Sequence, residues 1–511
     1  MSDWTGGYIS DIGYTYGYYN ELSPQRIKLA FLNAGIAPPE TINACELGFG
    51  QGISINIHAA ASSTTWHGTD FNPSQASYAL DLAVASGSKA QLFDDAFAEF
   101  CDRSELPQFD FIGLHGIWSW ISEENRHVIV DFVRRKLNVG GVLYISYNTQ
   151  PGWAAVAPLR DLLAEHAELM GAPGHGVLPR IDAALEFVEK VLDSGARYGL
   201  NNPQVSARLA ALKKQNRNYL AHEYFNRDWM PMSFSKMKTW LDDAKLTFAC
   251  SATMLEHVDV LNLQGEQQQI LKDIPDRAFR ETVRDFLVNQ QFRRDYWVRG
   301  MRTMSSAERI DKLRRQRFVM VVPRDEIELK VDSVVGKATL HENIYKPILD
   351  LLGDYRIHSL QDVELVLKEV SDFNGALQAL IILVGKGCVS MAQNDVEINA
   401  ASAACNRLNG ELCSQARQSS AVSVLASPVT GGGITATRFD QIFLFASKDT
   451  ANDPAAWARY LIKSLAKQGE RMLIGGVLPE SVDAESNEAL RLAHDFLAKR
   501  LPLLRALRVQ A

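Results

Sequence analysis

The sequence contains few cysteines and no long apolar run, and each shortage excludes a class of protein. Its 511 residues include six cysteines, none of which forms a Cys-x-x-Cys pair. This scatter argues against a zinc site and against the disulfide framework of a small secreted domain. No apolar run of about 18 residues and no signal-peptide pattern is present. We therefore expect a cytoplasmic protein that does not span a membrane.

An excess of positive charge is also absent. The formal net charge is −7, from 53 basic and 60 acidic residues. Such a chain has no overall attraction for nucleic acid or for an anionic membrane, and we expect neither as a partner. With 511 residues, the chain is too long for a single hydrophobic core and should contain about two or three domains.

Two motifs for phosphate and metal chemistry are missing as well. No Gly-Lys-Ser/Thr follows a glycine-rich segment, which excludes a P-loop. The pair His222-Glu223 has no second histidine at the spacing of a metalloprotease motif. We therefore expect no metal site.

The feature around which the chain is organised is a glycine-rich turn between a strand and a helix. An apolar run at 41–45 leads into Glu46, and Gly48, Gly50 and Gly52 then precede a helical segment at 53–61. Glycine allows a sharp turn and a close ligand approach, and open α/β sheets bind ligands at the carboxyl ends of such strands. The third glycine comes too early for a dinucleotide fingerprint. The leading acid suits a positively charged ligand such as S-adenosylmethionine; an ordinary glycine-rich turn is the alternative.

The next two predicted strands also end in acidic residues. The strand at 65–69 leads into Asp70, which lies 18 residues beyond Gly52. In doubly wound nucleotide sites, an acid about 20 residues on hydrogen-bonds the ribose hydroxyls. The strand at 90–93 leads into Asp94-Asp95-Ala96-Phe97, where an acid and an aromatic ring suit the amino group and the ring of adenine.

Strands at 109–114 and 142–146 complete a parallel set that alternates with helices. This alternation predicts an α/β fold with a Rossmann-like sheet, whose strand ends share one edge. Two β-like segments at 246–254 and 292–298 are expected to add an antiparallel hairpin at the far edge. The fourth and fifth strands are followed by polar and aromatic residues. These residues include His115, Trp120, Tyr147, Asn148 and Trp153.

Composition and periodicity divide the chain into two domains, 1–305 and 306–511. The first begins with an aromatic, glycine-rich segment at 1–24, interpreted as a lid or as packing on the sheet edge, and contains a helical insertion at about 157–230. This insertion offers a plausible homodimer surface. The second domain is α+β. Its segment 318–392 has a predicted β pair at 318–323 and 327–331 and three helices, the outline of a winged-helix-like unit with a packing or regulatory role. Residues 427–433 are predicted to form a flexible loop.

The motifs as a set resemble the class I S-adenosylmethionine-dependent methyltransferases. The segments 109–120 and 146–153 resemble those of the bacterial branch that carries a C-terminal methyltransferase regulatory domain. That branch includes rickettsial outer-membrane-protein lysine methyltransferases. The resemblance implies S-adenosyl-L-methionine as the cofactor. The cofactor-binding residues expected from the motifs and the resemblance together are Glu46, Gly48, Phe49, Gly50, Gly52, Asp70, Phe71, Asp94, Asp95, Ala96, Phe97, Leu114 and His115.

The acceptor that we expect is a lysine side chain of a protein, and relatives suggest a surface, flagellar or outer-membrane protein. A lysine must lose a proton first, and a narrow aromatic channel lowers its pKa by desolvation. The candidate catalytic residues are Tyr19, His115, Trp120, Tyr147 and Asn148, with Trp153 as a further wall residue. A sugar or small-molecule hydroxyl is the alternative acceptor, with His115 as general base. A second alternative is a non-catalytic S-adenosylmethionine-binding regulator.

Overall fold

A computed structural model describes residues 15–171, 176–450 and 452–510 of the chain. The first domain is built on a seven-stranded sheet with the strand order β3-β2-β1-β4-β5-β7-β6. β1 to β5 run parallel, and β7 runs antiparallel to both β5 and β6. The strands are β1 Asn43–Leu47, β2 Thr65–Thr69, β3 Gln91–Phe93, β4 Phe109–Leu114, β5 Leu137–Asn148, β6 Leu246–Ser251 and β7 Phe292–Arg299.

This sheet confirms the predicted Rossmann-like fold and the antiparallel hairpin at its edge. β5 begins earlier than the predicted 142–146, because Leu137 already pairs with Phe109 of β4. The β4–β5 register then shifts between Phe109 and Phe111. The aromatic residues Trp4, Tyr8 and Tyr14 of the predicted lid lie outside the described residues.

Helices cover both faces of the sheet, and local signals set where they begin. Asn72 caps α3 through Ser74 N–H, and Ser122 caps α5 through Asn125 N–H. Such caps satisfy backbone donors that have no partner within the helix. The helices are α1 Pro24–Asn33, α2 Ile53–Ala61, α3 Pro73–Ser86, α4 Phe97–Asp102, α5 Glu123–Lys136, α11 Phe234–Asp242, α12 Asp259–Asn262, α13 Gly265–Asp273 and α14 Arg277–Val288.

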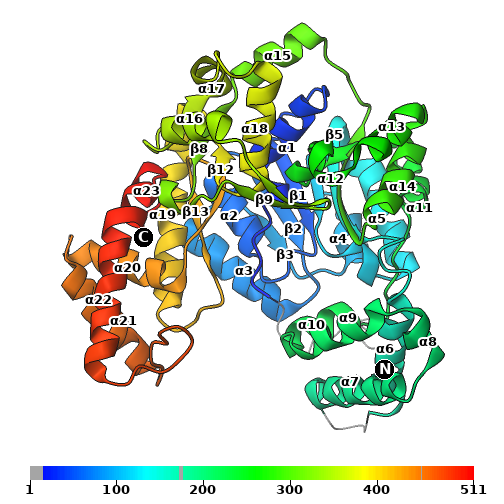
Figure 1. The fold of residues 1–511 in the computed structure, drawn as a ribbon, viewed down its shortest axis with the longest axis horizontal. Helices are drawn as coiled ribbons and strands as arrows, with labels where there is room; N and C mark the ends of the chain where they lie inside the picture. The colour runs from blue at the N-terminus through cyan, green and yellow to red at the C-terminus, as the bar shows by residue number, and fades with distance from the viewer. Residues whose placement is uncertain (1–14, 172–175, 451, 511) are drawn as a thin grey trace.

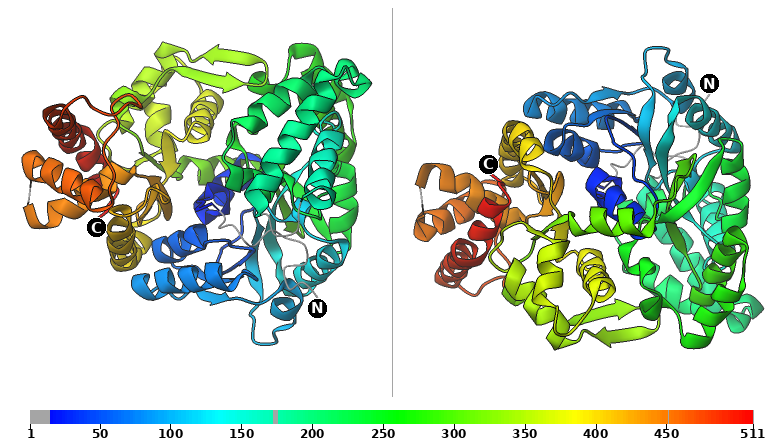
Figure 2. Two further views of the ribbon diagram at one scale, coloured as in Figure 1. Left: turned by 90° about the horizontal axis from the view of Figure 1, so that it is seen from below. Right: turned by 90° about the horizontal axis from the view of Figure 1, so that it is seen from above.

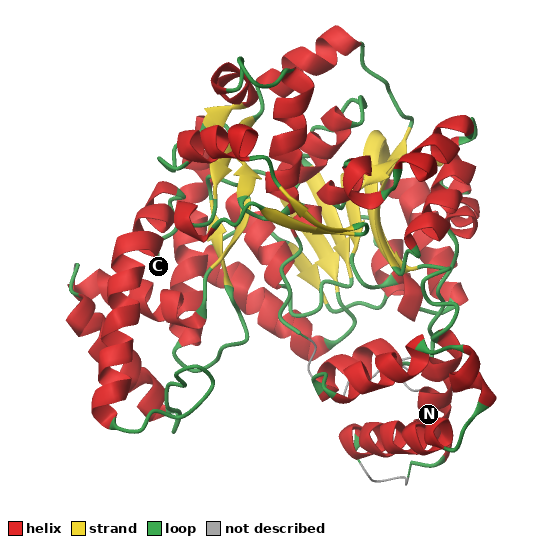
Figure 3. Ribbon diagram, in the orientation of Figure 1, coloured by secondary structure: helices red, strands yellow, loops and turns green. Residues whose placement is uncertain are grey.

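The insertion after β5 forms a helical module with its own small core. Its elements are α6 Ala157–Leu169, α7 Val177–Asp193, α8 Arg197–Asn201, α9 Gln204–Lys213 and α10 Arg217–Tyr224. Trp153, Leu163, Leu185 and Leu209 belong to the buried cluster that holds it together. The arrowheads of the parallel strands point toward the end of the sheet near which the module lies (Figures 1 and 3).

The chain after β7 begins with α15 Ser306–Arg314 and a three-stranded sheet in the order β11-β8-β12. The three predicted helices are present, but the predicted β pair is wrong. Among the described residues, β8 pairs with β11 and β12, whereas β9 pairs with β10. The partners of β8 are set by tertiary packing between segments that are distant in the sequence. The elements are β8 Arg317–Met320, β9 Lys330–Ser333, β10 Gly336–Thr339, α16 Glu342–Leu352, β11 His358–Ser359, α17 Leu360–Val366, α18 Phe373–Gly385 and β12 Val389–Met391.

The last part of the chain is mainly helical and packs on α2 and α3. Residues 427–433, predicted to be a flexible loop, form the turn of the hairpin between β13 and β14 and the adjoining strand ends. Gly431 in the turn and Gly432 at the start of β14 are buried. All nine residues of α2 are buried, because this hairpin and α19 cover the helix. The elements are α19 Asp395–Ala416, β13 Val424–Ser427, β14 Gly432–Thr435, α20 Arg438–Thr450, α21 Pro454–Lys467, α22 Val482–Asp495 and α23 Leu501–Ala506.

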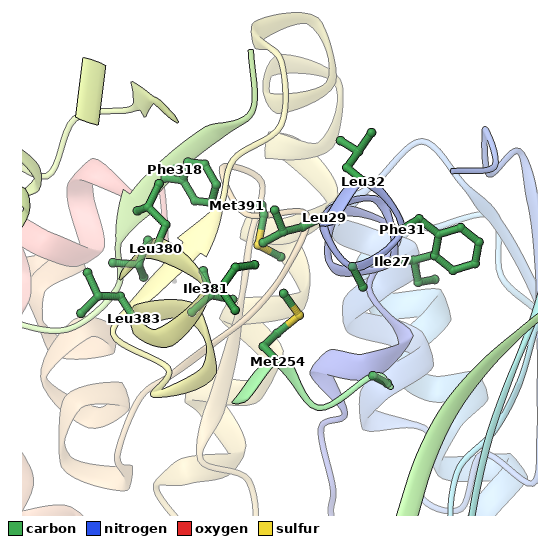
Figure 4. Packing of buried hydrophobic residues seen from close by; sticks show 14 of the residues in the cluster. Ile27, Leu29, Phe31, Leu32, Met254, Phe318, Leu380, Ile381, Leu383 and Met391 are labelled. Carbon is green, nitrogen blue, oxygen red and sulfur yellow. The ribbon is translucent and has the colours of Figure 1, made fainter. Parts of the chain in front are cut away.

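The two halves of the chain share their hydrophobic cores. In the largest buried cluster, Leu29 of α1 and Met254 lie beside Leu380 and Ile381 of α18 (Figure 4). A second cluster joins Ile53 and Ile57 of α2 to the C-terminal helices. In both views of Figure 2, these helices lie at one end of the molecule and the helical module lies toward the other end. The domain boundary near residue 305 stays a prediction.

Candidate active site

A cavity of about 380 Å³ opens at the carboxyl edge of the sheet, among the ends of β1, β2, β3 and β4. Its size falls in the range of small-molecule sites. We call it the site cavity. The predicted site residues that line it are Tyr19, Gly48, Phe49, Gly50, Asp70, Phe71, Asp95, Ala96, Phe97, His115 and Trp120.

The glycine turn after β1 forms the floor of the site cavity. Gly48, Gly50 and Gly52 all have left-handed φ values, +75°, +58° and +70°. A Cβ atom on Gly48 would lie 2.4 Å from Cδ1 of Ile117, and both this contact and the left-handed φ favour glycine here. Gly52 does not line the cavity; a Cβ there would lie 2.3 Å from Cβ of Ala79, which shows that this glycine lets α2 and α3 pack closely.

Asp70 fixes the same turn from the end of β2. Its Oδ2 accepts the Gly50 N–H at 2.8 Å, and its Oδ1 accepts the Asn72 N–H at 3.1 Å. Burial raises the pKa of Asp70 to about 6, although the two backbone donors act in the opposite direction. A carboxylate has about four lone-pair positions, so two remain for a ligand with hydroxyl groups.

Glu46 lies behind the turn and not on the cavity wall. Its side chain is 1% exposed, and its Oε2 atom has no hydrogen-bond partner among the described residues. Burial, and then the charge of the neighbouring Asp70, raise the pKa of Glu46 well above its ordinary value. A bound ligand could donate a hydrogen bond to this buried carboxyl oxygen.

His115 and Tyr19 form a stacked pair on the opposite wall. Their ring centroids are 3.5 Å apart with an angle of 19° between the planes. The His115 Nδ1 atom is 2.8 Å from the Tyr144 hydroxyl. Burial lowers the pKa of His115 to about 4, so its imidazole is neutral at pH 7.

The wall of the site cavity carries more negative than positive charge. It is lined by four carboxylates and one guanidinium, that of Arg227, which pairs with Asp228 at 3.1 Å. Asp95, expected to bind an adenine amino group, has both carboxylate oxygens held by Arg103. A cavity with this balance favours a cationic ligand. The four acidic lining residues are Asp70, Asp95, Glu124 and Asp228.

Two predicted catalytic residues do not reach the site cavity. Along β5, Tyr144 and Ser146 face the His115 loop, so Tyr147 points to the other face, where its hydroxyl donates to Asp295 Oδ2 at 2.9 Å. The amide oxygen of Asn148 accepts the Trp153 Nε1–H at 3.1 Å, and Asn148 does not line the site cavity. The predicted residues absent from the lining are Glu46, Gly52, Asp94, Leu114, Tyr147 and Asn148, together with Trp153.

Sequence reasoning missed the residues that complete the rim. Glu124 and Asn125 begin α5, and Arg227 and Asp228 follow α10 of the helical module. The first pair could have been found, because the start of a helix after a parallel strand lies at the same edge as the strand end. The second pair carries no local signal, since only the folded position of the module places it here.

The comparisons with known proteins agree with this geometry. The chain is 39% identical over 509 residues to the protein sll1526 of Synechocystis sp., and the alignment covers 98% of each chain. It is 28% identical over 265 residues to the protein RP789 of Rickettsia prowazekii, over 51% of this chain and 46% of that one. The structure of PKMT2 from Rickettsia typhi in complex with AdoHcy matches with a TM-score of 0.68 and 17% identity, over 97% of this chain and 99% of that one.

The sheet order and this structural match define the class: the chain has the fold of the class I S-adenosylmethionine-dependent methyltransferases. The chain belongs to the family of the Synechocystis protein sll1526. A family model described as a predicted methyltransferase regulatory domain matches residues 216–299. These residues run from α10 to β7. A regulatory role for residues 306–511 stays a prediction.

Within the described ranges, no group of three or more His, Cys, Asp or Glu side chains is placed to hold a metal ion. None of the helices in the same ranges combines the length and the apolar character needed to cross a bilayer.

Proposed function

We propose that this protein is an S-adenosylmethionine-dependent methyltransferase whose acceptor is a lysine side chain of a protein. The observation that carries the proposal is the site cavity itself. It joins a left-handed glycine turn and Asp70 to a wall of aromatic and acidic side chains at the carboxyl edge of a class I sheet.

The residues present fit the cofactor. The turn Gly48–Gly50 lets a ligand approach the backbone, Asp70 has acceptor positions for the ribose hydroxyls, and Phe71 and Phe97 offer apolar surface for the base. Behind the turn, Glu46 offers a buried carboxyl oxygen that has no hydrogen-bond partner among the described residues. When bound, S-adenosylmethionine supplies a methyl group carried on a positively charged sulfur.

The remaining wall suits an amine acceptor. A lysine has a reference pKa of about 10.4, so keeping its amine neutral at pH 7 costs roughly 4–5 kcal/mol. Desolvation between the rings of Tyr19 and Trp120, which line the cavity, reduces this cost. Glu124 and Asp228 at the rim attract the side chain while it is still charged. The protein's task is then to align the amine and to exclude water.

A hydroxyl acceptor is the second candidate, because the neutral imidazole of His115 lies on the cavity wall. For a hydroxyl, a general base is required, whereas an amine that has already lost its proton needs none. We expect His115→Ala to abolish transfer to a hydroxyl and to lower transfer to a lysine by about tenfold or less. Initial rates on both acceptors test this, and a near-complete loss on the lysine-bearing protein would count against the lysine assignment.

The pH dependence of cofactor binding is set by Asp70. The pKa of Asp70 is raised to about 6, so the carboxylate is ionised at pH 8 and mostly protonated at pH 5. Because protonation removes an acceptor and a negative charge, we expect the Kd for S-adenosylhomocysteine to be about tenfold higher at pH 5 than at pH 8. Calorimetry across this range measures it. Asp70→Asn should bind weakly at pH 8 without that rise, and an unchanged pH profile in the variant would refute the assignment.

The experiment that tests the function is transfer of a labelled methyl group from S-adenosylmethionine to proteins of a host lysate, followed by location of the labelled atom. The proposal predicts label on lysine Nζ atoms. Label on a hydroxyl oxygen would favour the second candidate. Binding without transfer to any component would favour a non-catalytic regulator.

A further inference from the structure

Tyr19, whose side chain lines the site cavity, is positioned by helix α2. The backbone of Tyr19 is held at two points by α2: its N–H donates to Ser54 Oγ at 3.2 Å, and its carbonyl oxygen is 3.0 Å from His58 Nε2. The ring of Tyr19 then stacks on His115. The positions of α2 and of His58 therefore determine the position of the Tyr19 ring on the cavity wall.

His58 is suited to hold Tyr19 and is not used by the chemistry proposed above. The residue is completely buried, and its ring lies parallel to that of Trp66, with centroids 5.4 Å apart. Because a carbonyl oxygen can only accept, a neutral His58 must carry its proton on Nε2 to bond Tyr19. The backbone of Gly431, in the β13–β14 turn, also interacts with the His58 ring.

The β13–β14 hairpin of the C-terminal part packs against Tyr18 and lies close to His58. A Cβ atom on Gly432 would lie 2.4 Å from the Tyr18 hydroxyl oxygen and 3.8 Å from Cε1 of His58, and one on Gly433 would lie 3.0 Å from the Tyr18 ring. The rings of Tyr18 and His58 are themselves 5.1 Å apart. The turn is thus in direct contact with Tyr18 and close to His58.

The hairpin is hydrogen-bonded to the C-terminal part of the chain at two points. The side chain of Asn409 in α19 bonds both the N–H and the carbonyl oxygen of Ala426, at 2.7 and 2.9 Å. The Ser427 hydroxyl donates to the Leu507 carbonyl oxygen, just after α23, at 2.8 Å. A displacement of these helices would move the turn, and with it Tyr18.

We infer that His58 is a positioning residue, and that the turn Gly431–Gly433 acts through Tyr18 and His58 to fix Tyr19 on the wall of the site cavity. The C-terminal part of the chain thereby sets how tightly the cavity holds its ligand. The inference rests on the proposed function only for the identity of that ligand.

A matched pair of variants of the full chain tests the role of His58. Glutamine can place an N–H where His58 has Nε2–H, whereas the shorter asparagine cannot. We expect His58→Asn to raise the Kd for S-adenosylhomocysteine by roughly three- to tenfold, as for one lost hydrogen bond, and His58→Gln to stay within about twofold of the wild type. Calorimetry measures the affinity, and the melting temperature shows whether each variant is folded.

A glycine pair tests the C-terminal turn separately, and it keeps the test decisive if His58→Asn fails to fold. Gly432→Ala forces Tyr18 to shift and should also raise the Kd by roughly threefold or more, whereas Gly265→Ala, with open space around its Cβ, should not. Failure of the wild type to bind S-adenosylhomocysteine would overturn the proposed function. Wild-type binding with equal affinities of the two His58 variants, or an unchanged affinity of Gly432→Ala, would overturn this inference.

Discussion

Gly50→Val is expected to raise the Kd for S-adenosylhomocysteine by at least about 100-fold while the protein stays folded. Gly50 lines the site cavity with φ at +58°, a conformation that a β-branched residue adopts only under strain. Its N–H also donates to Asp70, so a shifted backbone would disturb the carboxylate expected to bind the ribose. Calorimetry on the purified variant measures the effect.

The control for Gly50→Val is Gly140→Val. Gly140 also has a left-handed φ, +86°, but a Cβ there meets no atom within 4 Å, and the residue lies outside the site cavity. This variant carries a similar backbone strain without touching the site, so its affinity should match that of the wild type. Equal affinities of Gly50→Val and the wild type would contradict the assignment of the turn.

Arg293→Met is expected to lower the free energy of unfolding by roughly 3–5 kcal/mol, because it leaves buried carboxylates without their cation. Arg293 on β7 is 4% exposed and pairs with Asp285 at 2.5 Å and with Asp295 and Glu281 at 2.9 Å. Asp295 also accepts the Tyr147 hydroxyl, so the network fixes that side chain away from the cavity. Denaturant unfolding gives the value.

The loss in Arg293→Met should be larger at pH 8 than at pH 6. Burial already raises the pKa of Asp285 to about 7 and that of Asp295 to about 6, and removal of the cation raises both further. When folding raises the pKa of a carboxyl, the free energy of unfolding falls as the pH rises, because the folded protein must then hold a buried negative charge. Arg315→Met, at an exposed pair with Asp311, should cost less than about 1 kcal/mol. A comparably small loss for Arg293→Met would refute the role of the network.

Local sequence patterns were sufficient for the sheet and for the glycine turn. Alternating apolar strands and helices, with Gly48 to Gly52 and Asp70 at strand ends, predict that these strands run parallel, without knowledge of distant contacts. The same reasoning placed Tyr147 in the site because it follows a strand tip. Side chains alternate between the two faces of β5, so Tyr147 lies on the face opposite to Tyr144 and Ser146. The sequence does not show which of the two faces borders the site.

Features that depend on distant parts of the chain could not be predicted. The segment 427–433 has the composition of a loop, yet Tyr18, His58 and the C-terminal helices cover it. The partners of β8 lie about 40 and 70 residues further along the chain, beyond any local signal. Arg227 and Asp228 reach the site only through the packing of the helical module.

The most direct test of the account is equilibrium binding of labelled S-adenosylmethionine to the full-length protein, with NAD and ATP as competitors. A cavity formed by a glycine turn, Asp70 and an acidic wall should bind one molecule per chain, and S-adenosylhomocysteine should displace it while neither competitor does. No saturable uptake, or displacement by NAD with equal strength, would contradict the assignment of this cavity.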